Sequence, residues 1–152
     1  MLPETSQRVH INTCDSSNER IRNAMTERVA EYRNASAESI SRRLDELDQE
    51  WDIERTLEAN AATLGFAGCV LAAAVDRRWI YLPMAVTAFL FQHAVQGWCP
   101  PLPVLRSLGV RTMREIDEER MALKAIRGDF RQQRRSESSV ISAEALVRMA
   151  ER

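Results

Sequence analysis

The side chains best suited to chemistry lie near the end of a long uncharged stretch. They are His93 and Cys99, with a second cysteine, Cys69, further upstream. Imidazole and thiolate both bind soft or borderline metal ions, and a Cys-Pro pair such as Cys99-Pro100 can present its sulfur to a haem iron. The spacing matches no zinc motif of the CxxC type. Three roles stay open: structural hydrogen bonding, which we favour, a metal or haem site, and a thiol relay through Cys99. We assign no catalytic residue, no metal and no cofactor.

The motifs of the common enzyme classes are missing from the 152-residue sequence. It has no Gly-rich phosphate loop, no nucleophile elbow and no HExxH pattern. We interpret the run Asp117-Glu118-Glu119 as a solvated helix face, not as a dicarboxylate site. The arginines after residue 105 are interrupted by acids and lack interleaved aromatics, so we expect no nucleic-acid partner. The question of an enzyme stays open, and we lean towards none.

The sequence around His93 and Cys99 predicts a hydrophobic helical hairpin. The run from Ala59 to Val75 is uncharged, Asp76-Arg77-Arg78 interrupts it, and the run from Trp79 to Leu105 contains no acid, lysine or arginine. About 17 to 20 apolar residues suffice to cross a hydrocarbon layer of roughly 30 Å. The sequence therefore predicts an all-α fold with a two-helix transmembrane hairpin over residues 59–105.

Two sets of residues inside this hairpin are candidates for packing and for polar contacts. Small residues at steps of four, three and four form a predicted helix-packing face: Ala61, Gly65, Gly68 and Ala72. Polar residues on the last turns of the second run form a predicted intramembrane cluster: Gln92, His93 and Gln96. We interpret Cys69 as an inert packing residue.

The rest of the chain forms two polar arms. We divide it into a loose tail (1–15), a cytoplasmic helical arm (16–58), a cytoplasmic helix after the hairpin (106–128), and a linker with a short helix (129–152). Residues 1–58 carry thirteen acids and eight arginines, whereas residues 106–152 carry eleven Lys/Arg and eight acids. The arms therefore have opposite net charge. They could pair with each other, or the basic arm could lie on an anionic leaflet.

Local signals place the helix ends in these arms. Ser16 with Glu19, and Thr112 with Glu115, match capping boxes. Gly128 is a candidate C-cap. A further helix cap is expected at Ser142. One seam at helical spacing consists of Ile40, Leu44, Leu47 and Trp51. Because no Gly or Pro separates this seam from Ala59, one continuous rod into the hairpin is compatible with the sequence.

The order of these features resembles a known family. Glu54-Arg55 precedes a small-residue hydrophobic helix, and after a short turn and a second helix come Gly97-Trp98-Cys99-Pro100 and Leu108-Gly109. This order, over about residues 50–110, resembles the YgaP-like inner-membrane domain. In that family two short helices form a membrane hairpin, the second ends in Gly-x-Cys-Pro, and the module occurs alone or as the anchor of a rhodanese-type sulfurtransferase. The resemblance implies a homodimer in the membrane, with Cys99 as the motif cysteine. This chain lacks a rhodanese domain and its Cys-Arg active-site loop, so the resemblance does not extend to sulfur transfer.

The location follows from charge. Arg and Lys are concentrated at the outer ends of the hairpin, and only Arg77 and Arg78 lie in its turn, which places both termini in the cytoplasm by the positive-inside rule. We expect a bacterial inner-membrane protein whose partners are the lipid bilayer, a second copy and a cytoplasmic protein. The first hypothesis is a non-enzymatic protein that self-associates through its hairpin. The alternatives are a sulfur or redox accessory that uses Cys99, and a soluble all-α oligomer that buries the hairpin.

Overall fold

The structure is a computed structural model in which residues 4–130 are described, and within that range it is all-helical. The all-α prediction is confirmed for these residues. The α-helices and two 3₁₀ turns are α1 (Arg8–Ile11), α2 (Asp15–Glu31), η1 (Tyr32–Asn34), α3 (Ala37–Gln49), α4 (Ile53–Ala74), η2 (Arg77–Ile80), α5 (Tyr81–Gln96), α6 (Leu102–Ser107) and α7 (Met113–Arg127). The predictions for a linker and for a helix cap at Ser142 lie mostly outside the described residues.

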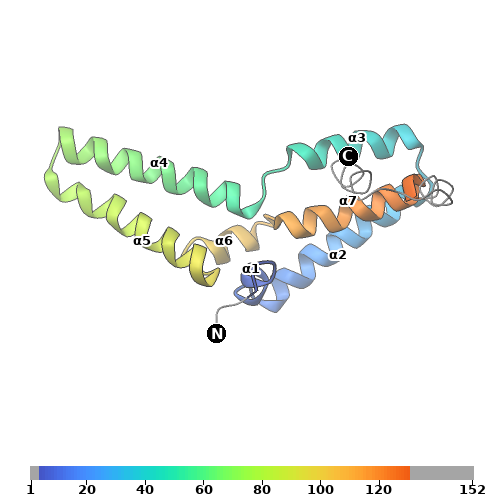
Figure 1. Ribbon diagram of the computed structural model, residues 1–152, viewed down its shortest axis with the longest axis horizontal. Coiled ribbons are helices and arrows are strands. Elements are labelled where there is room, and N and C mark those ends of the chain that lie inside the picture. Colours follow the sequence, from blue (N-terminus) through green and yellow to red (C-terminus); the bar gives the residue numbers. More distant parts are fainter. Residues whose placement is uncertain (1–3, 131–152) are drawn as a thin grey trace, which may run out of the picture.

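The molecule is elongated and has two ends of different character (Figure 1). At one end α4 and α5 run antiparallel as a hairpin, connected by η2. At the other end α7 packs against both α2 and α3. The short helices α1 and α6 lie between these two parts, where they join the hairpin to the three-helix unit.

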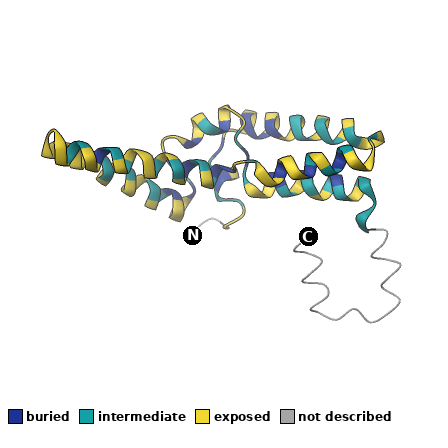
Figure 2. Cartoon of the chain, turned by 90° about the horizontal axis from the view of Figure 1, so that it is seen from above, coloured by how far each residue is buried: buried dark blue, intermediate teal, exposed yellow. Residues whose placement is uncertain are grey.

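Two apolar cores hold these parts together. The first lies at the junction and consists of Val9, Ile53, Leu57, Cys99 and Leu102. The second lies between α3 and α7 and consists of Ile40, Leu44, Leu47, Ile116 and Leu123. Figure 2 shows dark blue, buried residues mainly in the junction and the three-helix unit, whereas the hairpin is mostly yellow and teal. The hairpin therefore owes little of its apolar burial to the rest of the chain.

The continuous rod is not formed, because the chain leaves the helical conformation between α3 and α4 (Figure 1). The Asp52 side chain accepts a hydrogen bond from the Arg55 amide at 2.9 Å and so begins α4 anew. The Ile53 amide donates to the Arg111 carbonyl at 2.8 Å. Trp51 consequently leaves the predicted seam. Its ring is half exposed and lies 4.4 Å from the Arg55 guanidinium.

The predicted helix caps have mixed outcomes. The Thr112–Glu115 capping box is confirmed, and Gly128 ends α7 with a left-handed φ of 92°. The capping box at Ser16 is wrong, because α2 begins at Asp15 with Cys14 in the N-cap position and no side-chain cap. The prediction of a loose tail over residues 1–15 is also wrong for α1, which packs into the junction through Val9.

In the described part of the chain, α3 and α4 together (Ala37–Ala74) contain one segment long and apolar enough to cross a membrane, and 11% of that segment is buried. It lies in α4, since α3 is strongly polar. At 16 residues, α5 is shorter than a usual spanning helix. The structure thus shows a helical hairpin with one candidate membrane span in the described residues. That α5 also crosses the membrane is a proposal.

Candidate functional site

A polar clamp closes the base of the hairpin; it consists of Arg8, Glu54 and His93. Glu54 lies in the first turn of α4, and its Oε2 is 3.0 Å from Nε2 of His93 in the last turn of α5. Arg8 of α1 donates from Nη2 to the other carboxylate oxygen at 2.8 Å. Hydrogen bonds from His93 and then from Arg8 lower the pKa of Glu54 to about 2, against the effect of burial. The clamp therefore contains an ionised carboxylate that joins three helices.

Residues of α1 and of the turn after it donate hydrogen bonds to free carbonyls at the C-terminal end of α5. The last carbonyls of a helix have no partner inside that helix. Here Arg8 Nη1 donates to the Ala94 carbonyl at 3.1 Å, and Asn12 Nδ2 donates to the Gln96 carbonyl at 2.9 Å. Gly97 has a φ of +79°, and a Cβ there would lie 2.5 Å from the Arg8 carbonyl oxygen. Only glycine allows both the left-handed turn and this close approach.

The predicted intramembrane cluster of Gln92, His93 and Gln96 does not form as a unit. The His93 side chain is 2% exposed and points to the clamp, whereas Gln92 is half-buried and Gln96 is exposed. Within residues 4–130 their side chains make no hydrogen bond to one another, and Gln96 takes part through its backbone carbonyl only. Residues three and four apart share a helix face, but the partner that matters for His93 is on α4.

Cys99 is part of the junction core and not a surface thiol. It is 3% exposed and packs in the cluster with Val9, Ile53, Leu57 and Leu102. The turn through Pro100 and Pro101 leads directly into α6, and the Leu102 amide donates to the Cys99 carbonyl at 3.1 Å. A thiol relay through Cys99 needs an accessible sulfur, and this structure buries it, because the prolines turn the chain back into α6. Cys69, by contrast, is exposed on α4.

Sequence reasoning overlooked Cys14. It is exposed at the start of α2, and its Sγ lies 3.1 Å from Ser17 Oγ. Hydrogen bonds with Ser16 and Ser17 lower the pKa of the Cys14 thiol to about 7. Serine two and three positions after a cysteine at a helix start was the available signal. Among the three cysteines, Cys14 has the environment of a reactive thiol.

One residue of the predicted small-residue face, Gly68, packs against α5 within the same chain. Gly68 is buried, and Ala61, Gly65 and Ala72 are half-buried. The four positions are not equivalent: a Cβ on Gly68 would lie 2.5 Å from Pro83 Cδ, whereas a Cβ on Gly65 would meet nothing within 4 Å. Close approach of the two hairpin helices therefore depends on Gly68.

An apolar groove of about 380 Å³ opens beside this contact, between α4, α5 and α6. Leu64, Val86 and Phe89 lie along it, and Cys99 and Pro100 are among the residues at the α6 end. Its lining is almost wholly apolar, with Asn60 and His93 as the polar exceptions. In water such a groove would add to the exposed apolar surface of the hairpin.

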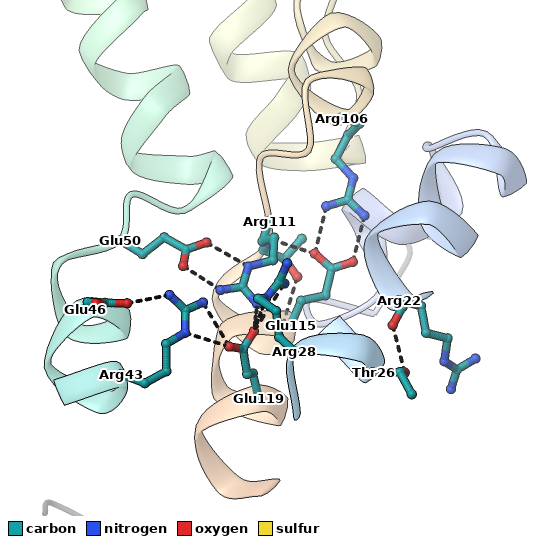
Figure 3. Close-up of polar contacts among 11 residues, drawn as sticks. Arg22, Thr26, Arg28, Arg43, Glu46, Glu50, Arg106, Arg111, Glu115 and Glu119 are labelled. Atoms are coloured by element: carbon teal, nitrogen blue, oxygen red, sulfur yellow. Dashed lines mark hydrogen bonds and ion pairs between the residues drawn. The ribbon is translucent and has the colours of Figure 1, made fainter. Parts of the chain in front are cut away.

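The two arms pair with each other through buried ions (Figure 3). Glu119 of α7 is 1% exposed and accepts hydrogen bonds from Arg28 of α2, Arg43 of α3 and Arg111. Arg111 also donates to Glu50, next to the break between α3 and α4. Burial acts to raise the pKa of Glu119, but the charge of Arg111 and the hydrogen bond from Arg43 hold the pKa below its ordinary value.

A second buried pair lies beside the first. Arg106 is fully buried, donates to both carboxylate oxygens of Glu115 at 2.7 Å, and donates to Asn18 of α2 at 3.0 Å.

The interpretation of Asp117-Glu118-Glu119 as one solvated face is wrong for Glu119, because that side chain is buried. Its spacing from Ile116 and Leu123, three before and four after, places it on the buried face and was the signal that we missed.

The buried charged side chains of these networks pair with one another. The described residues contain no group of three His, Cys, Asp or Glu side chains placed to hold a metal ion. Comparison of the chain with protein-family models, with curated proteins and with solved structures finds no match. The resemblance to the YgaP-like domain accordingly stays a prediction.

Proposed function

We propose that this chain is a non-enzymatic protein of the bacterial inner membrane, in which the α4–α5 hairpin inserts into lipid. In this proposal α2, α3 and α7 form a cytoplasmic helical unit that presents its surface to a protein partner. Both termini face the cytoplasm. The YgaP-like domain is the family whose hairpin this arrangement resembles.

The observation that carries the proposal is the exposed apolar surface of the hairpin. Large apolar side chains are exposed along both helices and their turn: Leu64, Phe66, Val70, Val75, Trp79, Ile80, Tyr81, Met84, Phe89, Phe91 and Val95. Soluble monomers rarely expose a continuous apolar surface of this extent. Lipid is the environment in which such a surface is stable.

The length of the hairpin sets a further condition. The uncharged part of α4, residues 59–74, spans about 24 Å at 1.5 Å per residue, which is less than the roughly 30 Å of a typical hydrocarbon layer. Thinning of the bilayer and extension of Arg77 and Arg78 to the far interface compensate for such a mismatch. The polar clamp at the base and the charged turn at the tip then mark the two interfaces.

Self-association is part of the proposal, but Gly68 of the face Ala61-Gly65-Gly68-Ala72 already packs against α5 within the chain. The outer surface of α4 offers another contact, because Phe66, Cys69 and Val70 are exposed there. A homodimer through this surface would bring two Cys69 side chains near the dimer axis. The alternative role as a sulfur or redox accessory requires a movement that uncovers Cys99.

The test is a topology map in membrane vesicles of known orientation. The native Cys14 reports on the cytoplasmic arm, and Arg78→Cys reports on the tip of the hairpin. We expect a membrane-impermeant maleimide to label Cys14 from the cytoplasmic side only and Arg78→Cys from the opposite side only. Phe66→Lys with Val70→Lys should lower the membrane-bound fraction, while Arg33→Gln, a change in the three-helix unit, should not. Recovery of the wild-type chain in the soluble fraction as an oligomer would replace this proposal with the soluble, all-α alternative.

A further inference from the structure

The apolar groove between α4, α5 and α6 is lined by a buried side chain with an unpaired polar atom. His93 lines this groove of about 380 Å³, and its side chain is 2% exposed. Nε2 of its ring meets Glu54, but Nδ1 has no hydrogen-bond partner among the described residues. A buried acceptor or donor without a partner destabilises a fold, so such an atom calls for an explanation.

The clamp sets the state of this imidazole ring. Glu54 is ionised and can only accept hydrogen bonds, so Nε2 of His93 carries the proton in their contact. The Arg8 guanidinium, 2.8 Å from the other carboxylate oxygen, already balances the charge of Glu54. A neutral imidazole therefore leaves no net charge in the clamp, which a low-dielectric environment favours. In that neutral ring Nδ1 is an acceptor with a free lone pair.

The other polar residue of the lining offers an acceptor as well. Asn60 donates from Nδ2 to the Thr56 carbonyl at 2.7 Å. Its Oδ1 accepts no hydrogen bond from any residue that the structure describes. Both polar residues of the groove thus present an acceptor, and a ligand with a hydrogen-bond donor is the chemical complement.

The rest of the groove is apolar and of limited length. From His93 to Val86 it follows α5 for about 10 Å at 1.5 Å per residue, with Leu64 and Phe89 along its walls. Small-molecule sites have volumes of roughly 300–1,000 Å³ and are likewise mostly apolar with a few placed polar groups. Water is a poor occupant of such a groove, because a bound water needs about two to four polar partners.

We propose that this groove binds an apolar molecule that carries one hydroxyl group, of the class of alkylphenols and long-chain alcohols. Its apolar part lies along Leu64, Val86 and Phe89, and its hydroxyl donates to Nδ1 of His93. A lipid tail fits the same walls but has no donor for the ring. The proposal goes beyond membrane insertion, because a hairpin inserts whether or not this groove holds a ligand.

The experiment compares two probes on the full chain in lipid nanodiscs. 4-Nonylphenol carries the hydroxyl, whereas 4-nonylanisole has a methyl ether in its place and cannot donate. Nitrogen-15 NMR of the histidine-labelled chain follows Nδ1 of His93, and His10→Gln assigns the signals, since the sequence has two histidines. Fluorine NMR of the chain labelled with fluorophenylalanine follows occupancy at Phe89, and Phe89→Leu assigns that signal.

We expect 4-nonylphenol to shift the His93 Nδ1 signal saturably. It should bind roughly two- to tenfold more tightly than 4-nonylanisole, which is the effect of one net hydrogen bond. His93→Gln keeps a side-chain N–H for Glu54 and removes the Nδ1 acceptor, so this variant should bind the two probes equally. Equal affinity of both probes for the wild type would assign the groove to lipid tails and overturn the proposal.

A matched pair of variants tests the place of binding and leaves the clamp intact. Ala61→Phe puts a ring into the groove, whereas Ala62→Phe adds the same ring at the exposed neighbouring position outside it. We expect the first variant to abolish the 4-nonylphenol shift and the second to retain it. A shift that persists in Ala61→Phe would overturn the site. A chain that stays out of nanodiscs would contradict the proposed function, and the same titration in buffer then decides the site.

Discussion

Glu54 and His93 are 39 residues apart in the chain, yet their side chains meet at 3.0 Å where the two hairpin helices enter the junction. This contact fixes the register of α4 against α5 at the base, as the Gly68–Pro83 contact does further along. Arg8 completes it from α1. The hairpin is thus held at two levels by residues that are far apart in sequence.

The Glu54 carboxylate should make stability depend on pH. Its pKa is about 2 in the folded chain and 4.5 in the unfolded chain. A lowered folded pKa stabilises the fold above pH 4.5, and this contribution is lost as pH falls from about 5 to about 2. Because Glu54 is about a third exposed, we expect roughly 1–2 kcal/mol after allowance for solvent screening. Unfolding of the detergent-solubilised chain by denaturant, measured from pH 7 to pH 2, should show a loss that is smaller by this amount in Glu54→Gln than in the wild type, because Glu115 and Glu119 also have lowered pKa values and contribute to the loss in both. Glu58→Gln, one turn on and exposed, is the matched control, and an unchanged pH profile in Glu54→Gln would contradict the assignment.

The two hairpin glycines should respond differently to the same substitution. Gly68→Ala forces a methyl group into Pro83 and should destabilise the hairpin by about 1–3 kcal/mol. Gly65→Ala meets open space and should be neutral or stabilise the helix by up to about 1 kcal/mol. Thermal unfolding in detergent measures both. Equal effects of the two substitutions would show that a different face of α4 packs against α5.

The cysteines should react with a water-soluble maleimide in a defined order. In detergent we expect Cys14 to react first, since it is exposed and its pKa is lowered to about 7, and Cys99 to react only on unfolding. Cys69 should be accessible in a short-chain detergent and protected in lipid vesicles. Peptide mass spectrometry after timed labelling gives the order. Rapid labelling of Cys99 in the native chain would support the hypothesis of a thiol relay through Cys99.

Glu119 should be the most sensitive charged residue of the three-helix unit. Glu119→Gln leaves Arg111 buried with less compensation and should cost about 3–5 kcal/mol, as for other broken buried pairs. Glu118→Gln breaks only the exposed pair with Arg114 and should cost less than about 1 kcal/mol. Chemical unfolding followed by circular dichroism compares the two neighbours. If both variants unfold at the wild-type midpoint, the buried network contributes nothing to stability.

The sequence predicted the features that depend on neighbours in the chain. The hairpin helices, the cap at Thr112 and the helix end at Gly128 follow from composition and from contacts three or four residues apart. The clamp does not, because nothing near Glu54 or His93 in the sequence indicates its partner. The break at Asp52 was missed for a related reason: Arg111, whose carbonyl receives the Ile53 amide, is distant in sequence.

The candidate site was harder to predict than the fold. A Cys-Pro pair at a helix end looks accessible, and only the packing of α1 and α6 shows that Cys99 is buried. Likewise, Glu119 looks like one of three solvated acids until its alignment with Ile116 and Leu123 is noticed. Local patterns therefore located these residues correctly and assigned them the wrong environment.

The contact of Arg8 with the Ala94 carbonyl joins residues 86 positions apart. During synthesis the N-terminal segment is made first, but its binding surface at Gly97 exists only after both hairpin helices have been translated. Contacts of such long sequence separation form slowly. The base of the hairpin therefore closes only after α5 has been made, and until then the early segment is available to chaperones or to the wrong helix end.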